Sequence, residues 1–126
     1  MQKEKVIIIG SGPAGLTAAL YTARAKLNPL VFVGSQLGGQ VAITHEVENY
    51  PGFPEGLSGP DLVERMRAQA ERFGTRYEYS SIVEADFTHG RPFTLKDENG
   101  NEYQADSVVV TSGASPRKLQ IPGDDE

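Results

Sequence analysis

An apolar strand that runs through a glycine-rich turn into a helix is the feature that most constrains this chain. Residues 6–9 are Val-Ile-Ile-Ile, and residues 10–15 follow with the pattern Gly-x-Gly-x-x-Gly. Four consecutive apolar residues are typical of a parallel strand that is buried on both faces. In such a unit the first glycine permits the tight turn, the second lets the backbone approach a pyrophosphate, and the third lets the helix pack on the strand. The pattern therefore predicts a dinucleotide-binding fold.

The residues after the glycines continue this strand–helix–strand pattern. Pro13 suits the first turn of a helix, and apolar residues then recur at helical spacing up to Leu27. Asn28-Pro29 is expected to end the helix, and residues 30–33 are predicted as the second parallel strand. The helix N-terminus would stabilise a phosphate through free backbone N–H groups and the helix dipole, without a basic side chain. An ordinary strand–helix turn without a ligand is the alternative.

The end of the second predicted strand bears on the type of nucleotide. Dinucleotide folds usually place an Asp or Glu about 20 residues beyond the glycines, where it binds the ribose hydroxyls. Residues 33–36 of this chain are Val-Gly-Ser-Gln, so neither a carboxylate for NAD nor an arginine for the extra phosphate of NADP is present there. This weakens a nicotinamide interpretation and leaves the ribose to Ser35, Gln36 or backbone groups. Capping of a turn is the alternative role for Ser35.

A long loop and a second helix follow. Residues 34–59 are rich in Gly, Pro and short polar side chains, and a loop of this length is usually functional. A helix is predicted from Pro60 to Phe73 with Gly74 as its terminator, and Met66 and Phe73 are expected in the core.

The remainder alternates short strands with turns. Residues 76–80 are predicted as a third parallel strand, and the Asn99-Gly100 turn predicts a small antiparallel meander around residues 93–105. A separate buried strand, returning to the main sheet, is expected to start at Asp106.

Composition narrows the class of protein. The chain has 126 residues, 12 Lys and Arg against 17 Asp and Glu, a formal net charge of -5, and no cysteine. This balance argues against a nucleic-acid or anionic-membrane surface, and the absence of cysteine leaves no disulfide, thiolate metal site or redox dithiol. No signal peptide or membrane-spanning run is found, so a cytoplasmic protein is expected. No residue is predicted to be catalytic or to bind a metal.

Five motifs, in this order and spacing, resemble the bacterial thioredoxin reductases over essentially the whole chain. They are residues 10–15 (GSGPAG), 38–40 (GGQ), 47–52 (VENYPG), 59–62 (GPDL) and 111–115 (TSGAS). The flavin subunit of alkyl hydroperoxide reductase and the related ferredoxin NADP reductases share much of the pattern. The resemblance implies an α/β fold of the Rossmann-like, FAD/NAD(P)-binding, three-layer type, with a parallel sheet and a small antiparallel meander.

The resemblance also implies that the dinucleotide is FAD. The first loop would hold its pyrophosphate, the second would run along its adenosine and ribityl parts, Asn49 would lie near the flavin ring, and Val83 would approach the adenine. Residues 112 and 113 would close the site. The implied cofactor-binding residues are Gly10, Ser11, Gly12, Pro13, Ala14, Gly34, Ser35, Gln36, Leu37, Gly38, Gly39, Gln40, Asn49, Val83, Ser112 and Gly113.

In the complete enzymes of this family, a hydride passes from NADPH to FAD and then reduces the disulfide of thioredoxin or a similar protein. Residues 1–126 would be the first segment of the FAD-binding domain, with the NADPH domain and its Cys-x-x-Cys pair, the C-terminal FAD segment and a homodimer partner outside this chain. The alternatives are a related flavoprotein without the dithiol and a nucleotide-binding module without catalysis.

An incomplete FAD-binding domain has a consequence for the sheet. Residues 108–110 (Val-Val-Val) have the composition of an interior strand, but the strand that would cover their outer edge is expected outside these residues. The isolated chain is therefore predicted to be marginally stable, to associate through this edge, or to need a partner that supplies the missing part.

Overall fold

The structure is a computed structural model that describes residues 1–39, 47 and 50–111. Its regular elements, in chain order, are β1 (Gln2–Ile9), α1 (Pro13–Arg24), β2 (Leu30–Phe32), α2 (Gly59–Arg72), β3 (Arg76–Glu78), β4 (Ile82–Asp86), β5 (Phe93–Asp97) and β6 (Glu102–Val110).

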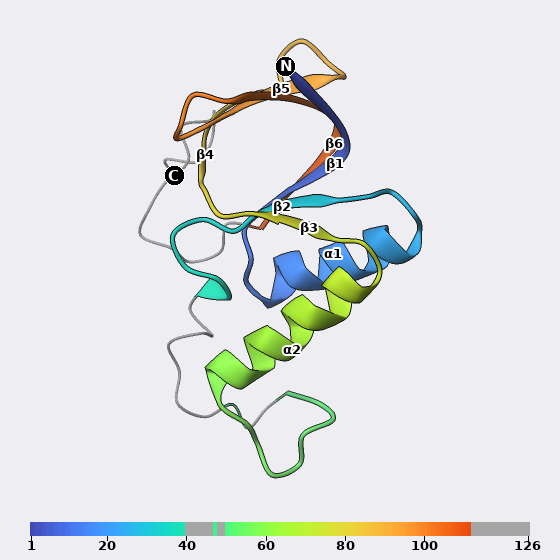
Figure 1. Cartoon of the computed structure of the whole chain (residues 1–126), viewed down its shortest axis with the longest axis vertical. Helices are drawn as coiled ribbons and strands as arrows, with labels where there is room; N and C mark the ends of the chain where they lie inside the picture. Colours follow the sequence, from blue (N-terminus) through green and yellow to red (C-terminus); the bar gives the residue numbers. More distant parts are fainter. Residues whose placement is uncertain (40–46, 48–49, 112–126) are drawn as a thin grey trace.

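The described strands form one mixed sheet in the order β3-β2-β1-β6-β5-β4. β1 pairs in parallel with β2 and β6, and β2 pairs in parallel with β3. β5 pairs antiparallel with β4 and β6, which confirms the predicted meander. α1 and α2 lie side by side on one face of the parallel strands, whereas β4 and β5 curl over the other face (Figure 1). These three layers are the predicted architecture.

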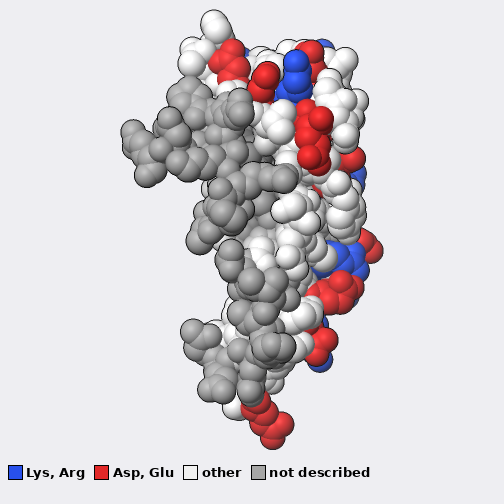
Figure 2. All heavy atoms as spheres, turned by 90° about the vertical axis from the view of Figure 1, so that its left-hand side faces the viewer, with Lys and Arg blue, Asp and Glu red and all other residues white. Residues whose placement is uncertain are grey.

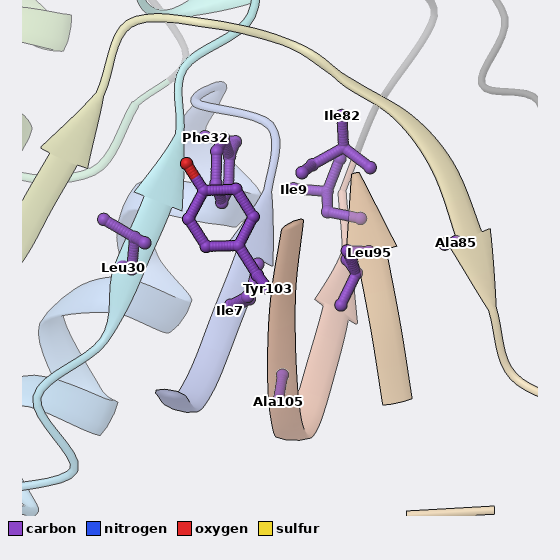
Figure 3. Close-up of a cluster of buried hydrophobic side chains, with 9 residues drawn as sticks. All are labelled: Ile7, Ile9, Leu30, Phe32, Ile82, Ala85, Leu95, Tyr103 and Ala105. Atoms are coloured by element: carbon purple, nitrogen blue, oxygen red, sulfur yellow. The ribbon is translucent and has the colours of Figure 1, made fainter. Parts of the chain in front are cut away.

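β1 supplies side chains to a hydrophobic core on each face of the sheet. Val6 and Ile8 pack toward the helices, while Ile7 and Ile9 pack toward the curled meander. The alternation follows from the period of two along a strand. The core under the meander is formed by Ile7, Ile9, Leu30, Phe32, Ile82, Ala85, Leu95, Tyr103 and Ala105 (Figure 3). Burial of both faces of β1 explains its uninterrupted apolar sequence.

α2 begins and ends with recognisable capping. The Ser58 side chain accepts a hydrogen bond of 3.1 Å from the Asp61 N–H, and Pro60 lies in the first turn.

Two expectations about the core are not met in full: Met66 is half-buried, and Phe73 is 40% exposed. The Phe73 prediction is wrong because the ring lies on the surface beneath the guanidinium groups of Arg24 and Arg72, at 6.0 and 5.4 Å from the ring centroid.

The last strand also differs from its prediction. A break between the meander and a strand starting at Asp106 was expected, but β6 is continuous from Glu102 to Val110. Residues 102–105 pair with β5, and the strand pairs with β1 between Tyr103 and Val110. The exposed apolar edge expected at residues 108–110 is present: Val108 and Val109 are half-buried and Val110 is 46% exposed.

Charges of both signs are interspersed on the described surface. On the face shown in Figure 2, Lys and Arg lie next to Asp and Glu. On α2, Arg67 contacts the carboxylates of Glu64 and Glu71, each at 2.7 Å. No helix within the described ranges is long and apolar enough to cross a membrane.

Candidate dinucleotide-binding site

The glycine-rich turn lies where the carboxyl ends of β1, β2 and β6 meet. The Gly10 N–H donates to the Phe32 carbonyl at 3.0 Å, which joins the end of β1 to the end of β2. The N–H and the Oγ1 of Thr111 each donate to the Ile9 carbonyl at 2.8 Å, which joins β1 to the end of β6. Ligands of open α/β sheets bind outside the carboxyl ends of the strands. The turn therefore has the position of a binding site.

Two of the three glycines are required by the packing of the protein itself. Gly10 has a φ of +109°, and a Cβ there would lie 2.3 Å from the Thr111 carbonyl oxygen. A Cβ at Gly15 would lie 2.3 Å from the Gly10 carbonyl oxygen. Both distances are far shorter than van der Waals contact, so these positions admit no side chain.

Gly12 differs from the other two glycines. Its φ is -72°, which any residue adopts, and the nearest atom to a Cβ built there is the Gly38 carbonyl oxygen at 3.8 Å. The described part of the surrounding protein thus leaves room for a methyl group at this position. A glycine that the fold does not need is consistent with close approach of a ligand to the backbone.

The N-terminus of α1 carries no group that competes with an anion. Gly12 is the N-cap and offers no side chain, Pro13 occupies the first turn, and that turn has no acidic residue. α2 begins differently, with a Ser58 cap and Asp61 in its first turn. The first N–H groups of a helix have no partner within the helix, and the helix dipole favours negative charge there. The start of α1 therefore fits a pyrophosphate.

The loop after β2 contacts the glycine-rich turn directly. The buried Ser11 hydroxyl lies 2.9 Å from the Val33 carbonyl oxygen and 3.1 Å from the Gly38 nitrogen. A Cβ built on Gly39 would lie 3.7 Å from the Gly12 Cα. Neither residues 10–16 nor residues 34–39 include an ionisable side chain. The two loops together form a surface of backbone and small side chains without formal charge.

The structure brings most of the predicted site residues into these two loops. The first loop contains Gly10, Ser11, Gly12, Pro13 and Ala14, and the second contains Gly34, Ser35, Gln36, Leu37, Gly38 and Gly39. Val83 belongs to neither loop but to β4, next to the register shift between Ile82 and Glu84, and is half-buried. The predictions for Gln40, Asn49, Ser112 and Gly113 fall outside the described residues.

Thr111 belongs to this site although it was not among the predicted residues. Besides its bonds to Ile9, its backbone lies against Gly10, and its Oγ1 is 2.7 Å from the position of a Cβ at Gly15. The sequence contains a signal for the place of Thr111, because this residue directly follows the Val-Val-Val segment and so stands at the end of a parallel strand. Its contact with the glycines required knowledge that this strand is the neighbour of β1.

Among the described residues, no group whose pKa the fold shifts belongs to either loop. Burial opposes ionisation of the Asp97 carboxylate at the β5–β6 turn, but hydrogen bonds from Asn101, Tyr103 and the Asn99 N–H outweigh it and lower the Asp97 pKa. Burial, and then the bond to Asp97, raise the Tyr103 pKa to about 12. The described part of the site therefore suits binding and orientation of a ligand more than proton transfer.

Comparison with known proteins agrees with this geometry. The model of the pyridine nucleotide-disulphide oxidoreductase family matches residues 4–126. Thioredoxin reductase of Streptomyces clavuligerus is 54% identical over 121 residues, which are 95% of this chain and 37% of that protein. Thioredoxin reductase of Rickettsia bellii is 50% identical over 122 residues, which are 97% of this chain and 39% of that protein.

A solved structure has the same fold. Thioredoxin reductase from Gloeobacter violaceus superimposes with a TM-score of 0.84 at 37% identity, covering 99% of this chain and 41% of that one. The chain thus spans about two fifths of the length of these relatives.

Proposed function

Because the chain belongs to the pyridine nucleotide-disulphide oxidoreductase family, we propose that residues 1–126 form the first segment of an FAD-binding domain. The complete protein would be an NADPH-dependent thioredoxin reductase. Family membership and the thioredoxin reductase relatives support this proposal.

The observation that carries the FAD-binding proposal is the open space at Gly12. Gly10 and Gly15 are fixed by contacts of 2.3 Å within the protein, whereas among the described residues the nearest atom to a Cβ built on Gly12 lies 3.8 Å away. A pyrophosphate that contacts the backbone at the uncapped start of α1 gives a reason for glycine there. The absence of an acidic residue at 33–36 weakens a nicotinamide interpretation of this site.

In this proposal the chain holds and orients the cofactor. Residues 10–14 would hold the pyrophosphate through backbone N–H groups, and residues 34–39 would line the adenosine side, with Gln40, Asn49, Val83, Ser112 and Gly113 proposed to complete the site. When bound, FAD supplies the redox chemistry, which is acceptance of a hydride from NADPH and reduction of a disulfide of thioredoxin or a similar protein.

The test compares wild type with Gly12→Ala by titration of FAD, followed by flavin fluorescence and visible absorbance. The added methyl group fits the free protein but occupies the space proposed for the pyrophosphate. We therefore expect unchanged circular dichroism and at least a tenfold loss of affinity, which corresponds to about 1.4 kcal/mol. Thr17→Ala, an exposed change in the same helix, is the matched control and should bind FAD as wild type does.

Two results would contradict the proposal. Equal FAD affinity of the Gly12→Ala variant and wild type would show that the ligand does not contact this turn. Failure of the complete, folded wild-type protein to bind FAD would remove the proposed cofactor from these residues.

A further inference from the structure

The Ser11 side chain is fully engaged by the protein. Ser11 is 3% exposed, and its hydroxyl donates toward the carbonyl oxygens of Val33 at 2.9 Å and Gln36 at 3.3 Å. The same oxygen accepts a hydrogen bond of 3.1 Å from the Gly38 N–H. A serine hydroxyl has one proton. Because that proton faces two carbonyl oxygens, Ser11 has none to donate to a phosphate.

The partners of Ser11 lie in the other loop of the site and at the residue directly before it. Val33 follows β2, and Gln36 and Gly38 lie in the loop of residues 34–39, so the bonds join segments separated by 22 to 27 residues. The Gly38 backbone also lies close to α2, since a Cβ there would lie 2.3 Å from a methyl carbon of Val63. The second loop is therefore in contact with both the Ser11 hydroxyl and α2.

We propose that Ser11 is a positioning residue that fixes the loop of residues 34–39 against the glycine-rich turn and so prepares both for one dinucleotide. This inference rests on the proposed function, and it assigns the side chain a role different from that of a phosphate ligand. Without the hydroxyl, the buried Gly38 N–H loses its partner, which favours opening of the loop. Ligand binding must then order the loop again, which lowers the affinity.

The first measurement needs no ligand. Hydrogen exchange of the Gly38 amide, followed by NMR on the 126-residue chain, should be at least tenfold faster in Ser11→Ala than in wild type. The Gly10 amide, which donates to Phe32 at 3.0 Å, is the internal reference and should keep its protection. Ser11→Cys preserves a side chain of similar shape but forms only weak hydrogen bonds, so it should resemble Ser11→Ala. If packing alone mattered, Ser11→Cys would resemble wild type and the inference would be wrong.

The second measurement is FAD affinity, which should fall in both variants by a factor comparable to the gain in Gly38 exchange. Unchanged Gly38 exchange would overturn the inference whatever the affinity. Faster exchange with unchanged FAD affinity would also overturn it, because the loop would be freed without affecting the ligand. Equal acceleration at Gly10 and Gly38 in both variants would show general destabilisation and reject a specific role. If the wild-type protein binds no FAD while Gly38 exchange is still faster in Ser11→Ala than in wild type, the proposed function has failed and the coupling of the loops has not.

Discussion

At the scale of single residues, Lys26 ends α1 in a way that the sequence did not reveal. The prediction that Asn28-Pro29 ends the helix is wrong, since α1 ends at Arg24. The Lys26 N–H donates to the Ala23 carbonyl at 2.9 Å and the Leu27 N–H donates to the Thr22 carbonyl at 3.0 Å. This pair of bonds defines the Schellman motif, whose left-handed position usually holds glycine. Here Lys26 occupies it with a φ of 63°.

Lys26→Gly should therefore stabilise the protein. Removal of the Cβ relieves the left-handed strain, and we expect the free energy of unfolding to rise by about 1 kcal/mol. Urea denaturation followed by circular dichroism measures the change. Ala25→Gly is the matched control: Ala25 has a φ of -80°, so the same loss of side chain should give no stabilisation. A lower urea midpoint for Lys26→Gly would show that the lysine stem contributes more than the strain costs.

At the scale of elements, the β5–β6 hairpin is organised by one buried carboxylate. Asp97 is 1% exposed and accepts hydrogen bonds from the N–H groups of Asn99 and Asn101, each at 2.9 Å. It also accepts from the Asn101 amide at 3.1 Å and the Tyr103 hydroxyl at 3.0 Å. The Tyr103 ring in turn packs edge-on against Phe32, with centroids 5.0 Å apart. The turn is thus linked to the central core.

Asp97→Asn should weaken the hairpin in a pH-dependent way. Because folding lowers the Asp97 pKa, the unfolded chain binds more protons than the folded chain below about pH 4. The contribution of the ionised Asp97 carboxylate to the free energy of unfolding is therefore complete above about pH 4 and is lost as the pH falls. We expect a loss of about 2 kcal/mol at neutral pH, and a smaller difference from wild type in acid. Urea midpoints between about pH 7 and pH 2 measure it.

The matched control for this prediction is Asp86→Asn at the end of β4. The hydrogen bonds from Thr88, followed by that from His89, lower the Asp86 pKa to about 2, but the carboxylate is exposed to solvent. We expect little change in the neutral urea midpoint of this variant. A pH-independent effect of Asp97→Asn would mean that its charge does not contribute to the hairpin.

At the scale of the whole molecule, the second half of β6 forms an open edge in the described part of the chain. β5 pairs with residues 102–105 only, so Asp106–Val110 have β1 as their one described strand neighbour. Val110 at this edge is 46% exposed. An exposed apolar strand edge is a template for pairing with another chain. The predicted association of the isolated chain therefore has a defined place in the fold.

Val110→Lys tests this association. A lysine at a strand edge opposes pairing between chains, so sedimentation velocity should show less concentration-dependent association than for wild type. Tyr79→Lys introduces the same charge at a residue that is 64% exposed and lies outside the strands, and it should leave association unchanged. Equal association of both variants and wild type would exclude this edge as the contact.

The sequence by itself determined the elements whose signals are local. The apolar run of β1, the glycine pattern, the first-turn residues of α2 and the Asn99-Gly100 turn each act over a few residues, so the elements and the position of the candidate loops in the chain could be predicted from them. Periodicity failed at Phe73, which is 40% exposed, because spacing along a helix does not say whether the end of that helix lies in the core.

Only the tertiary structure decided which distant segments meet. β6 is one strand because β1 pairs along its whole length, and no local pattern could report that pairing. The contact of Thr111 with the glycines and the bonds from Ser11 to the second loop have the same origin. A hydroxyl forms hydrogen bonds with whatever backbone group the fold places beside it. The residue type therefore predicts that a hydrogen bond can form, and only the three-dimensional arrangement decides which group is the partner.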